Sequence, residues 1–207
     1  MGPWDVPDAR WPSDNEWDIP SLDSDMQAVG LDMPAYLWGA VRRTAGMKGT
    51  WLFYCDDYRF EAPWKEPSTV VNTGCAAIVE PNFTIGTQTP RAVAIWQIYR
   101  KRWLARWWQS CGIKTIVDMN VDTETFRDLM LLGVPHGWKA YATRGYVSRM
   151  PATIAEYDLA CEHAGTKDIL FVLYGGGKQC AELARERGWP HLSEHMQLMQ
   201  SGEVSNG

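Results

Sequence analysis

Residues 75–118 read CAAIVEPNFTIGTQTPRAVAIWQIYRKRWLARWWQSCGIKTIVD. Two short apolar runs flank a segment in which neither glycine nor proline interrupts residues 91–111. Thr89 is a favourable N-cap, Pro90 suits the first helical turn, and Gly112 suits the left-handed residue that ends a helix. The stretch therefore predicts a strand, a long helix from Thr89-Pro90 to Cys111-Gly112 and a second strand, which together form one unit of a parallel sheet.

The same alternation of apolar runs and helical patterns continues on both sides of this unit. Five apolar runs predict strands, and they begin near residues 50, 75, 113, 138 and 168. Further helices are expected at Thr123–Leu132, Pro151–His163 and Cys180–Arg187. Short strands that alternate with helices predict an α/β protein with a mainly parallel sheet of about five strands. The pattern leaves open whether the sheet is an open, doubly wound one or part of a βα-barrel.

Composition divides the 207 residues into three parts. Residues 1–34 hold five prolines and three tryptophans, and residues 1–33 carry eight carboxylates against a single arginine. Because disordered segments are poor in aromatic residues, we expect this acidic arm to pack on the body, in cis or in trans. Residues 35–190 are expected to form one α/β domain, and residues 191–207 a flexible tail.

Five cysteines are scattered without a CxxC pair, and no apolar run is long enough to cross a bilayer. These features predict a cytoplasmic protein with reduced thiols and no membrane partner. The sequence does not indicate an oligomeric state.

Several short motifs occur in an order that is typical of one family. They are DYRFE at residues 57–61, PNFT at 81–84, YRKRW at 99–103 and QSCGI at 109–113. In these motifs, over roughly residues 50–175, the chain resembles the bacterial and phage family called domain of unknown function 4417. The resemblance implies an α/β fold and a phage or mobile-element setting, where the location would be the host cytoplasm, but it implies no activity. Asn82 stands where that family has an aspartate, and Val121 where it has a tryptophan.

Three carboxylates follow three successive predicted strands. They are Asp57, with Asp56 directly before it, Glu80 and Asp118. Proteins of this class bind ligands at the carboxyl ends of their strands, so the three side chains are expected at one edge of the sheet. Converging carboxylate oxygens suit Mg²⁺ or Mn²⁺, which can activate water against a phosphodiester. We therefore predict that these residues are catalytic and hold the metal.

A second group at the same edge is predicted to bind a phosphate-bearing ligand. In LYGGGKQC, residues 173–180, a strand is followed by three glycines, a lysine and the start of a helix. Glycines let backbone N–H groups approach an anion, and a helix N-terminus adds positive potential. The predicted ligand-binding residues are Arg59, Asn82, Arg144, Tyr174, Gly175, Gly176, Gly177 and Lys178.

The long helix is cationic, since no carboxylate lies between Glu80 and Asp118. Cations combined with aromatic rings are features of single-stranded nucleic-acid binding. The indoles Trp96, Trp103 and Trp107 lie at helical spacing and are expected to pack on the sheet. The predicted partner-binding residues are Arg100, Lys101, Arg102 and Arg106, which could instead pair with the acidic arm.

Taken with the strand-end residues, these patterns favour an enzyme that acts on a nucleotide or nucleic acid with metal assistance. The first alternative is a non-catalytic adaptor or inhibitor that binds a host protein or DNA through residues 90–111. The second alternative is a glycan-active barrel, which requires two carboxyl groups about 5–9 Å apart across a tryptophan-lined cleft.

Overall fold

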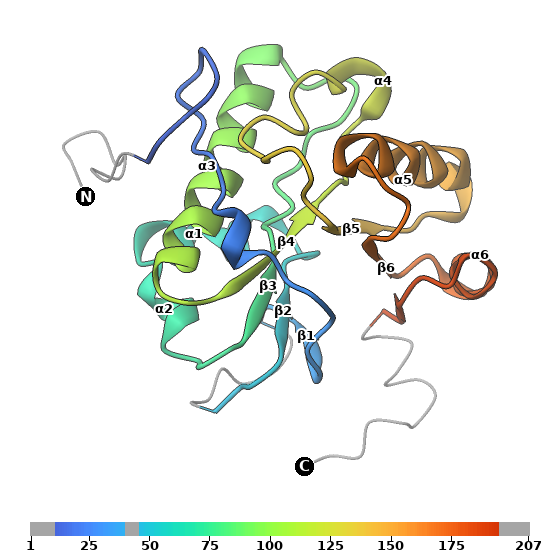
Figure 1. The fold of residues 1–207 in the computed structure, drawn as a ribbon, viewed down its shortest axis with the longest axis horizontal. Helices are drawn as coiled ribbons and strands as arrows, with labels where there is room; N and C mark the ends of the chain where they lie inside the picture. The colour runs from blue at the N-terminus through green and yellow to red at the C-terminus, as the bar shows by residue number, and fades with distance from the viewer. Residues whose placement is uncertain (1–10, 40–45, 195–207) are drawn as a thin grey trace.

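The structure, a computed structural model, describes residues 11–39 and 46–194. Its centre is a parallel sheet of seven strands whose spatial order follows the chain order (Figure 1). The strands are β1 (Ala35–Leu37), β2 (Thr50–Leu52), β3 (Ala77–Val79), β4 (Lys114–Asp118), β5 (Ala140–Arg144), β6 (Leu170–Tyr174) and β7 (His191–Leu192). The α/β class and the parallel sheet are confirmed. The strands added to the five expected are β1, directly after the acidic arm, and β7, in the stretch that was expected to be a flexible tail.

From β2 onward, helices connect successive strands and lie around the outside of the sheet (Figure 1). A sequential strand order with crossovers of one hand places the helices on one face. The helices are α1 (Glu61–Lys65), α2 (Ser68–Val71), α3 (Arg91–Ser110), α4 (Thr123–Phe126), α5 (Met150–Ala164) and α6 (Gly177–Arg187), with 3₁₀ turns η1 (Ser24–Met26), η2 (Asp57–Phe60) and η3 (Val147–Arg149).

The sheet curls into a half-barrel. Tyr54 follows β2, and Tyr174 ends β6, four strands away in the sheet. Four strand spacings in a flat sheet amount to roughly 19 Å. The two rings nevertheless stack with their centroids 5.2 Å apart and their planes at 11°. Of the two architectures that the sequence left open, the partial barrel is therefore correct.

The helix α3 covers β3 and β4, as the opening stretch predicts. Its N-cap is Pro90 rather than Thr89, whose hydroxyl instead accepts a hydrogen bond from the Gly86 amide at 3.0 Å. At the other end Gly112 has a φ of 89°, the left-handed conformation expected of a terminating glycine.

Aromatic rings fill the space between α3 and the first strands. Phe53 stacks on Trp38 and on Trp108, with centroid distances of 5.3 and 5.4 Å. The Trp108 indole donates to the Pro67 carbonyl at 2.9 Å, so this buried ring has a polar partner as well. Burial of rings of this size is a major stabilising term in a domain core.

The expected orientation of the α3 indoles is only partly correct. Trp103 is buried and Trp107 partly buried, but Trp96 is 40% exposed. Trp96 packs edge-on against Trp64 of α1 and stacks on Tyr99 within its own helix. Trp103 also packs edge-on against Trp64, so both rings contact α1 rather than only the sheet.

Residues 11–34 lie against α3 and the sheet. Ile19 and Leu22 are buried, and the Asp23 amide donates to Gln109 Oε1 of α3 at 2.8 Å. The Arg106 guanidinium lies 3.8 Å from the Asp23 carboxylate and 4.8 Å from the centre of the Trp11 ring.

The next residues of this segment enter the sheet itself. The Ala28 amide donates to the Thr115 carbonyl at 3.0 Å, and Gln27 Oε1 accepts from the Lys139 amide at 2.8 Å. The segment thus separates the first residues of β4 and β5, whose pairing begins at Val117. Trp17 is 43% exposed and so does not pack fully on the body, and Trp4 lies outside the described residues.

The helix α4 is shorter than expected. It begins as predicted, with the Asp122 carboxylate accepting from the Thr125 amide at 3.1 Å, but it ends at Phe126. Beyond the end of α4, the carbonyls of Met130 and Leu132 accept hydrogen bonds from Arg102. Over residues 11–39 and 46–194, no helix combines the length and the apolar character that crossing a bilayer requires.

Candidate functional site

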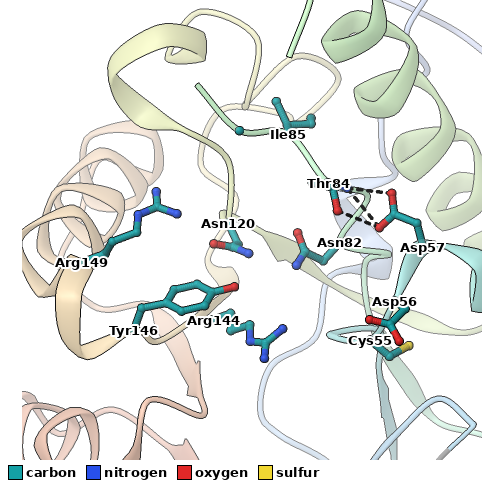
Figure 2. A pocket seen from close by; sticks show the side chains of 11 residues that line it. Cys55, Asp56, Asp57, Asn82, Thr84, Ile85, Asn120, Arg144, Tyr146 and Arg149 are labelled. Atoms are coloured by element: carbon teal, nitrogen blue, oxygen red, sulfur yellow. Dashed lines mark hydrogen bonds between the residues drawn. The ribbon is translucent and has the colours of Figure 1, made fainter. Parts of the chain in front are cut away.

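A cavity of about 350 Å³ lies at the carboxyl ends of the central strands (Figure 2). Segments that follow β2, β3, β4 and β5 contribute to it, so it occupies the edge where this class of fold binds ligands. Its lining residues are Cys55, Asp56, Asp57, Asn82, Thr84, Ile85, Gly86, Asn120, Arg144, Tyr146 and Arg149.

One wall of the cavity is acidic. The Asp57 carboxylate accepts from the Thr84 amide at 3.1 Å and from the Thr84 hydroxyl at 2.9 Å, which fixes it against the loop after β3. The Asp56 carboxylate is exposed and has no side-chain partner among the described residues. Burial raises the pKa of the Cys55 thiol to about 12, so this thiol stays neutral at physiological pH. Asp56 is therefore the acidic group that is free to contact a ligand.

The opposite wall is cationic. The guanidinium carbons of Arg144 and Arg149 lie 5.3 and 5.8 Å from the centre of the Tyr146 ring, which sits between them in the chain. Arg144 forms an ion pair with Glu194 at 3.6 Å, whereas Arg149 forms none within the described part of the chain. The buried Nε of Arg144 has no hydrogen-bond partner there either. This wall thus keeps donor capacity for an anion.

Two amides lie between the walls (Figure 2). Asn82 follows β3 and Asn120 follows β4, and both side chains face the cavity. The Asn120 backbone amide donates to Asp118 Oδ1 at 3.1 Å, which fixes the position of this residue. An amide side chain both donates and accepts, so this part of the cavity suits the polar middle of a ligand.

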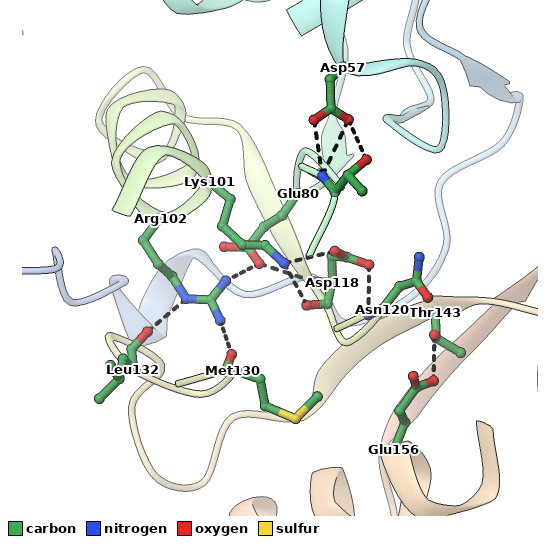
Figure 3. A network of polar contacts seen from close by, with 11 residues as sticks. Asp57, Glu80, Lys101, Arg102, Asp118, Asn120, Met130, Leu132, Thr143 and Glu156 are labelled. Carbon is green, nitrogen blue, oxygen red and sulfur yellow. Dashed lines mark hydrogen bonds and ion pairs between the residues drawn. The ribbon is translucent and has the colours of Figure 1, made fainter. Parts of the chain in front are cut away.

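Behind the cavity, two carboxylates of the predicted metal set are held in buried ion pairs (Figure 3). Lys101 Nζ lies 2.8 Å from Asp118 Oδ2 and also donates to the Asp118 carbonyl at 3.1 Å. Arg102 binds the Glu80 carboxylate and two backbone carbonyls. All four side chains are fully buried.

The structure therefore does not bring Asp57, Glu80 and Asp118 together as ligands of one ion. Asp57 lies in the cavity wall, while the other two carboxylates are neutralised by cations beneath it. Among the described residues, no group of three or more His, Cys, Asp or Glu side chains could hold a metal ion. All three carboxylates follow strands in the sequence. Spacing alone did not show that Lys101 and Arg102 of α3 would pair with Asp118 and Glu80.

The same contacts correct the predicted partner-binding surface on α3. Lys101 and Arg102 are 0% exposed and cannot contact a partner. The Arg100 guanidinium lies 4.0 Å from the centre of the Phe83 ring, and burial lowers its pKa. Arg106 contacts residues 11 and 23, as described above. The cations of this helix do not form a continuous exposed face.

A buried carboxyl group lies close to the cationic wall. Glu156 of α5 accepts a hydrogen bond from the Thr143 hydroxyl at 2.6 Å. Burial, followed by the charge of Asp118, raises the pKa of Glu156 to about 8, against the lowering effect of the Thr143 hydrogen bond. This shift favours the neutral form of the Glu156 carboxyl group at neutral pH.

Comparison with known proteins identifies the family. The model for the domain of unknown function DUF4417 matches residues 11–182. This chain belongs to the DUF4417 family. It is 30% identical to the Gene 1 protein of Mycobacterium phage D29 over 194 residues, which is 88% of this chain and 70% of the relative. It is 31% identical to the Gene 1 protein of Mycobacterium phage L5 over 160 residues, 73% of this chain and 70% of the relative. No solved structure matches the chain.

All the cavity residues lie within the stretch that matches the DUF4417 model. Of the ligand-binding residues predicted from the sequence, Asn82 and Arg144 line the cavity. Arg59 does not; it donates to the Gly39 carbonyl at 3.3 Å.

The glycine-rich turn of this DUF4417 protein also lies outside the cavity. Tyr174 is buried in the stack with Tyr54. A Cβ at Gly176 would collide with Cys180, and one at Gly175 would meet the Glu194 side chain, so these glycines permit close packing. Lys178 is largely exposed and lies 3.8 Å from Glu182 one turn along α6.

Sequence reasoning missed Cys55, Thr84, Ile85, Gly86, Tyr146 and Arg149 as cavity residues. Tyr146 and Arg149 belong to RGYVSRM, residues 144–150, in which two arginines flank a tyrosine directly after a strand. That spacing was the available signal.

Proposed function

We propose that this DUF4417 protein is phage- or mobile-element-encoded and is an enzyme that acts on a phosphate-bearing substrate in the strand-end cavity. The observation that carries the proposal is the opposition, across one cavity, of two guanidinium groups and a free carboxylate. Such an arrangement lets the guanidinium groups bind an anion at one end of a substrate while the carboxylate transfers a proton at the other end.

The cationic wall supplies the binding part. Guanidinium groups are planar, stay charged at all physiological pH values and form paired hydrogen bonds to phosphate oxygens. Arg144 and Arg149 both lie near the Tyr146 ring, which restricts their orientations before the substrate arrives. Restricting them beforehand lowers the entropy lost on binding.

The acidic wall supplies the chemical part. Asp56 is the carboxylate that can accept a proton from a hydroxyl group or water that faces it. Asp57 is held by Thr84 and orients this wall. Because Glu80 and Asp118 are neutralised by buried cations, the proposal assigns no step to a metal ion bound by the predicted set.

A nucleotide panel tests the proposal. Purified protein would be incubated with ribonucleoside mono-, di- and triphosphates, and products would be followed by phosphorus-31 NMR and chromatography. We expect turnover of at least one class, its loss in Asp56→Asn, and retention of inorganic phosphate binding in that variant because phosphate contacts only the arginines.

Binding is measured separately by isothermal titration with inorganic phosphate. Arg149→Gln is expected to weaken it at least ten-fold, whereas the matched control Arg185→Gln, an exposed arginine on α6, leaves it unchanged. Equal phosphate affinity in wild type and Arg149→Gln, or binding by neither, would contradict the proposal.

The alternative functions gain no comparable support. An adaptor that uses residues 90–111 would need exposed cations, two of which are fully buried. A glycan-active site would need carboxylates on opposite sides of a tryptophan-lined cleft, whereas Asp56 and Asp57 share one wall and the lining contains no tryptophan.

A further inference from the structure

We infer that the substrate is a ribonucleoside 5′-monophosphate, with its phosphate on Arg144 and Arg149 and its ribose diol on Asp56. This inference rests on the proposed function and names the substrate class of the same cavity. It depends on the charge of each wall, on which carboxylate is free, and on the size of the cavity.

The cationic wall matches a terminal phosphate. A phosphate monoester carries close to two negative charges at neutral pH, whereas each phosphodiester of a nucleic-acid strand carries one. Two arginines line this wall on either side of Tyr146, and Arg149 has no ion pair within the described residues. A monoester dianion would therefore pair with Arg149 and compete with Glu194, which lies 3.6 Å from Arg144, for the second guanidinium group.

The acidic wall matches a group that donates hydrogen bonds and carries no negative charge. An ionised carboxylate only accepts hydrogen bonds, and a pair of adjacent hydroxyls can donate to both of its oxygens. Acidic side chains bind ribose hydroxyls in this way in dinucleotide-binding folds. Asp57 already accepts from Thr84, so Asp56 is the acceptor that remains.

The size of the cavity favours one nucleotide over a strand. Its volume of about 350 Å³ lies near the lower end of the range for small-molecule sites. A bound strand would also need a row of exposed cations along its backbone. The most cationic segment, α3, has its Lys101 and Arg102 side chains buried in ion pairs.

Titration calorimetry with a graded set of ligands tests the inference. The ligands are inorganic phosphate, the four ribonucleoside 5′-monophosphates, and the 2′,3′-dideoxy form of whichever monophosphate binds most tightly. In the wild type, the ribonucleotide is expected to bind about ten-fold or more tighter than its dideoxy form, because hydrogen bonds to a charged acceptor are lost. In Asp56→Asn this difference should shrink to less than about three-fold.

Asp158→Asn, an exposed aspartate on α5 outside the cavity, is the matched control and should keep the full difference. Thermal melting of both variants shows that each is folded. Equal affinity for the ribose and dideoxy forms would overturn the inference while phosphate binding still supported the proposed function. Tighter binding of a six-residue oligoribonucleotide than of any mononucleotide would also overturn it. Failure of phosphate and all mononucleotides to bind would instead remove the proposed function itself.

Discussion

Two groups of charged side chains lie near the strand ends, one beneath the cavity and one in its walls. Both contain carboxylates and basic side chains, but they differ in burial and in ion pairing. Lys101, Arg102, Glu80 and Asp118 are completely buried and paired. Asp56 and Arg149 are exposed and have no ion-pair partner among the described residues. Charges of the first kind hold the half-barrel together, and charges of the second kind are available to a ligand. Burial and pairing, rather than position after a strand, separate the two roles.

Breaking a buried pair should have the largest effect on stability. Arg102→Met would leave the Glu80 carboxylate buried without its cation and two carbonyls without a donor. We expect the free energy of unfolding to fall by about 3–5 kcal/mol, measured by urea denaturation. The double variant Arg102→Met/Glu80→Gln also removes the unpaired Glu80 charge. Its free energy of unfolding should therefore fall by less than that of the single variant. A loss below about 1 kcal/mol in the single variant would contradict a structural role for this pair.

The buried carboxyl of Glu156 should make stability depend on pH. Its pKa of about 8 in the folded protein lies above the ordinary value of 4.5, so the folded state binds more protons between these limits. Stability is therefore greatest below the ordinary pKa and falls as the pH rises to about 8, by at most about 1.4 kcal/mol per pH unit from this group. Unfolding free energies at several pH values should show a shallower fall in Glu156→Gln. The exposed control Glu186→Gln should keep the wild-type slope.

The contact between α3 and the segment before β1 should contribute less. The ion pair of Arg106 with Asp23 is partly exposed, with the two groups 3.8 Å apart. Such pairs contribute about 0–1 kcal/mol, and the guanidinium also lies over the Trp11 ring. Arg106→Gln should therefore lower stability by no more than about 1–2 kcal/mol, and Asp23→Asn by less, as seen in thermal melting. An effect as large as that of Arg102→Met would mean that the exposed and buried charges do not differ as we describe.

The sequence predicted those elements of the fold in which apolar residues or helix-forming residues recur over a long enough stretch. The alternation of apolar runs with helices gave five strands, and Pro90 and Gly112 bounded α3 to within a residue or two. The edge strands β1 and β7 have three and two residues, and they lie directly after the acidic arm and within the stretch that was expected to be a tail. The curl of the sheet depends on contacts such as Tyr54 on Tyr174, which join residues 120 positions apart.

The site was predictable as a region but only partly as a set of residues. Asp57, Asn82 and Arg144 follow strands and line the cavity, as that position suggested. Glu80 and Asp118 also follow strands, but Lys101 and Arg102 of the connecting helix α3 neutralise them. No spacing rule shows that cations of this helix will reach these carboxylates, because that depends on how the helix packs.

Among these variants, Arg149→Gln should change stability least and phosphate binding most. Arg149 is exposed, so Arg149→Gln is expected to change the free energy of unfolding by less than about 0.5 kcal/mol. The most direct test is a single preparation of this variant, measured by urea denaturation and by calorimetric titration with inorganic phosphate. Unchanged stability with affinity weakened at least ten-fold is the expected result. Unchanged affinity, or a loss of stability comparable to that of Arg102→Met, would contradict the assignment of the exposed charges to a ligand.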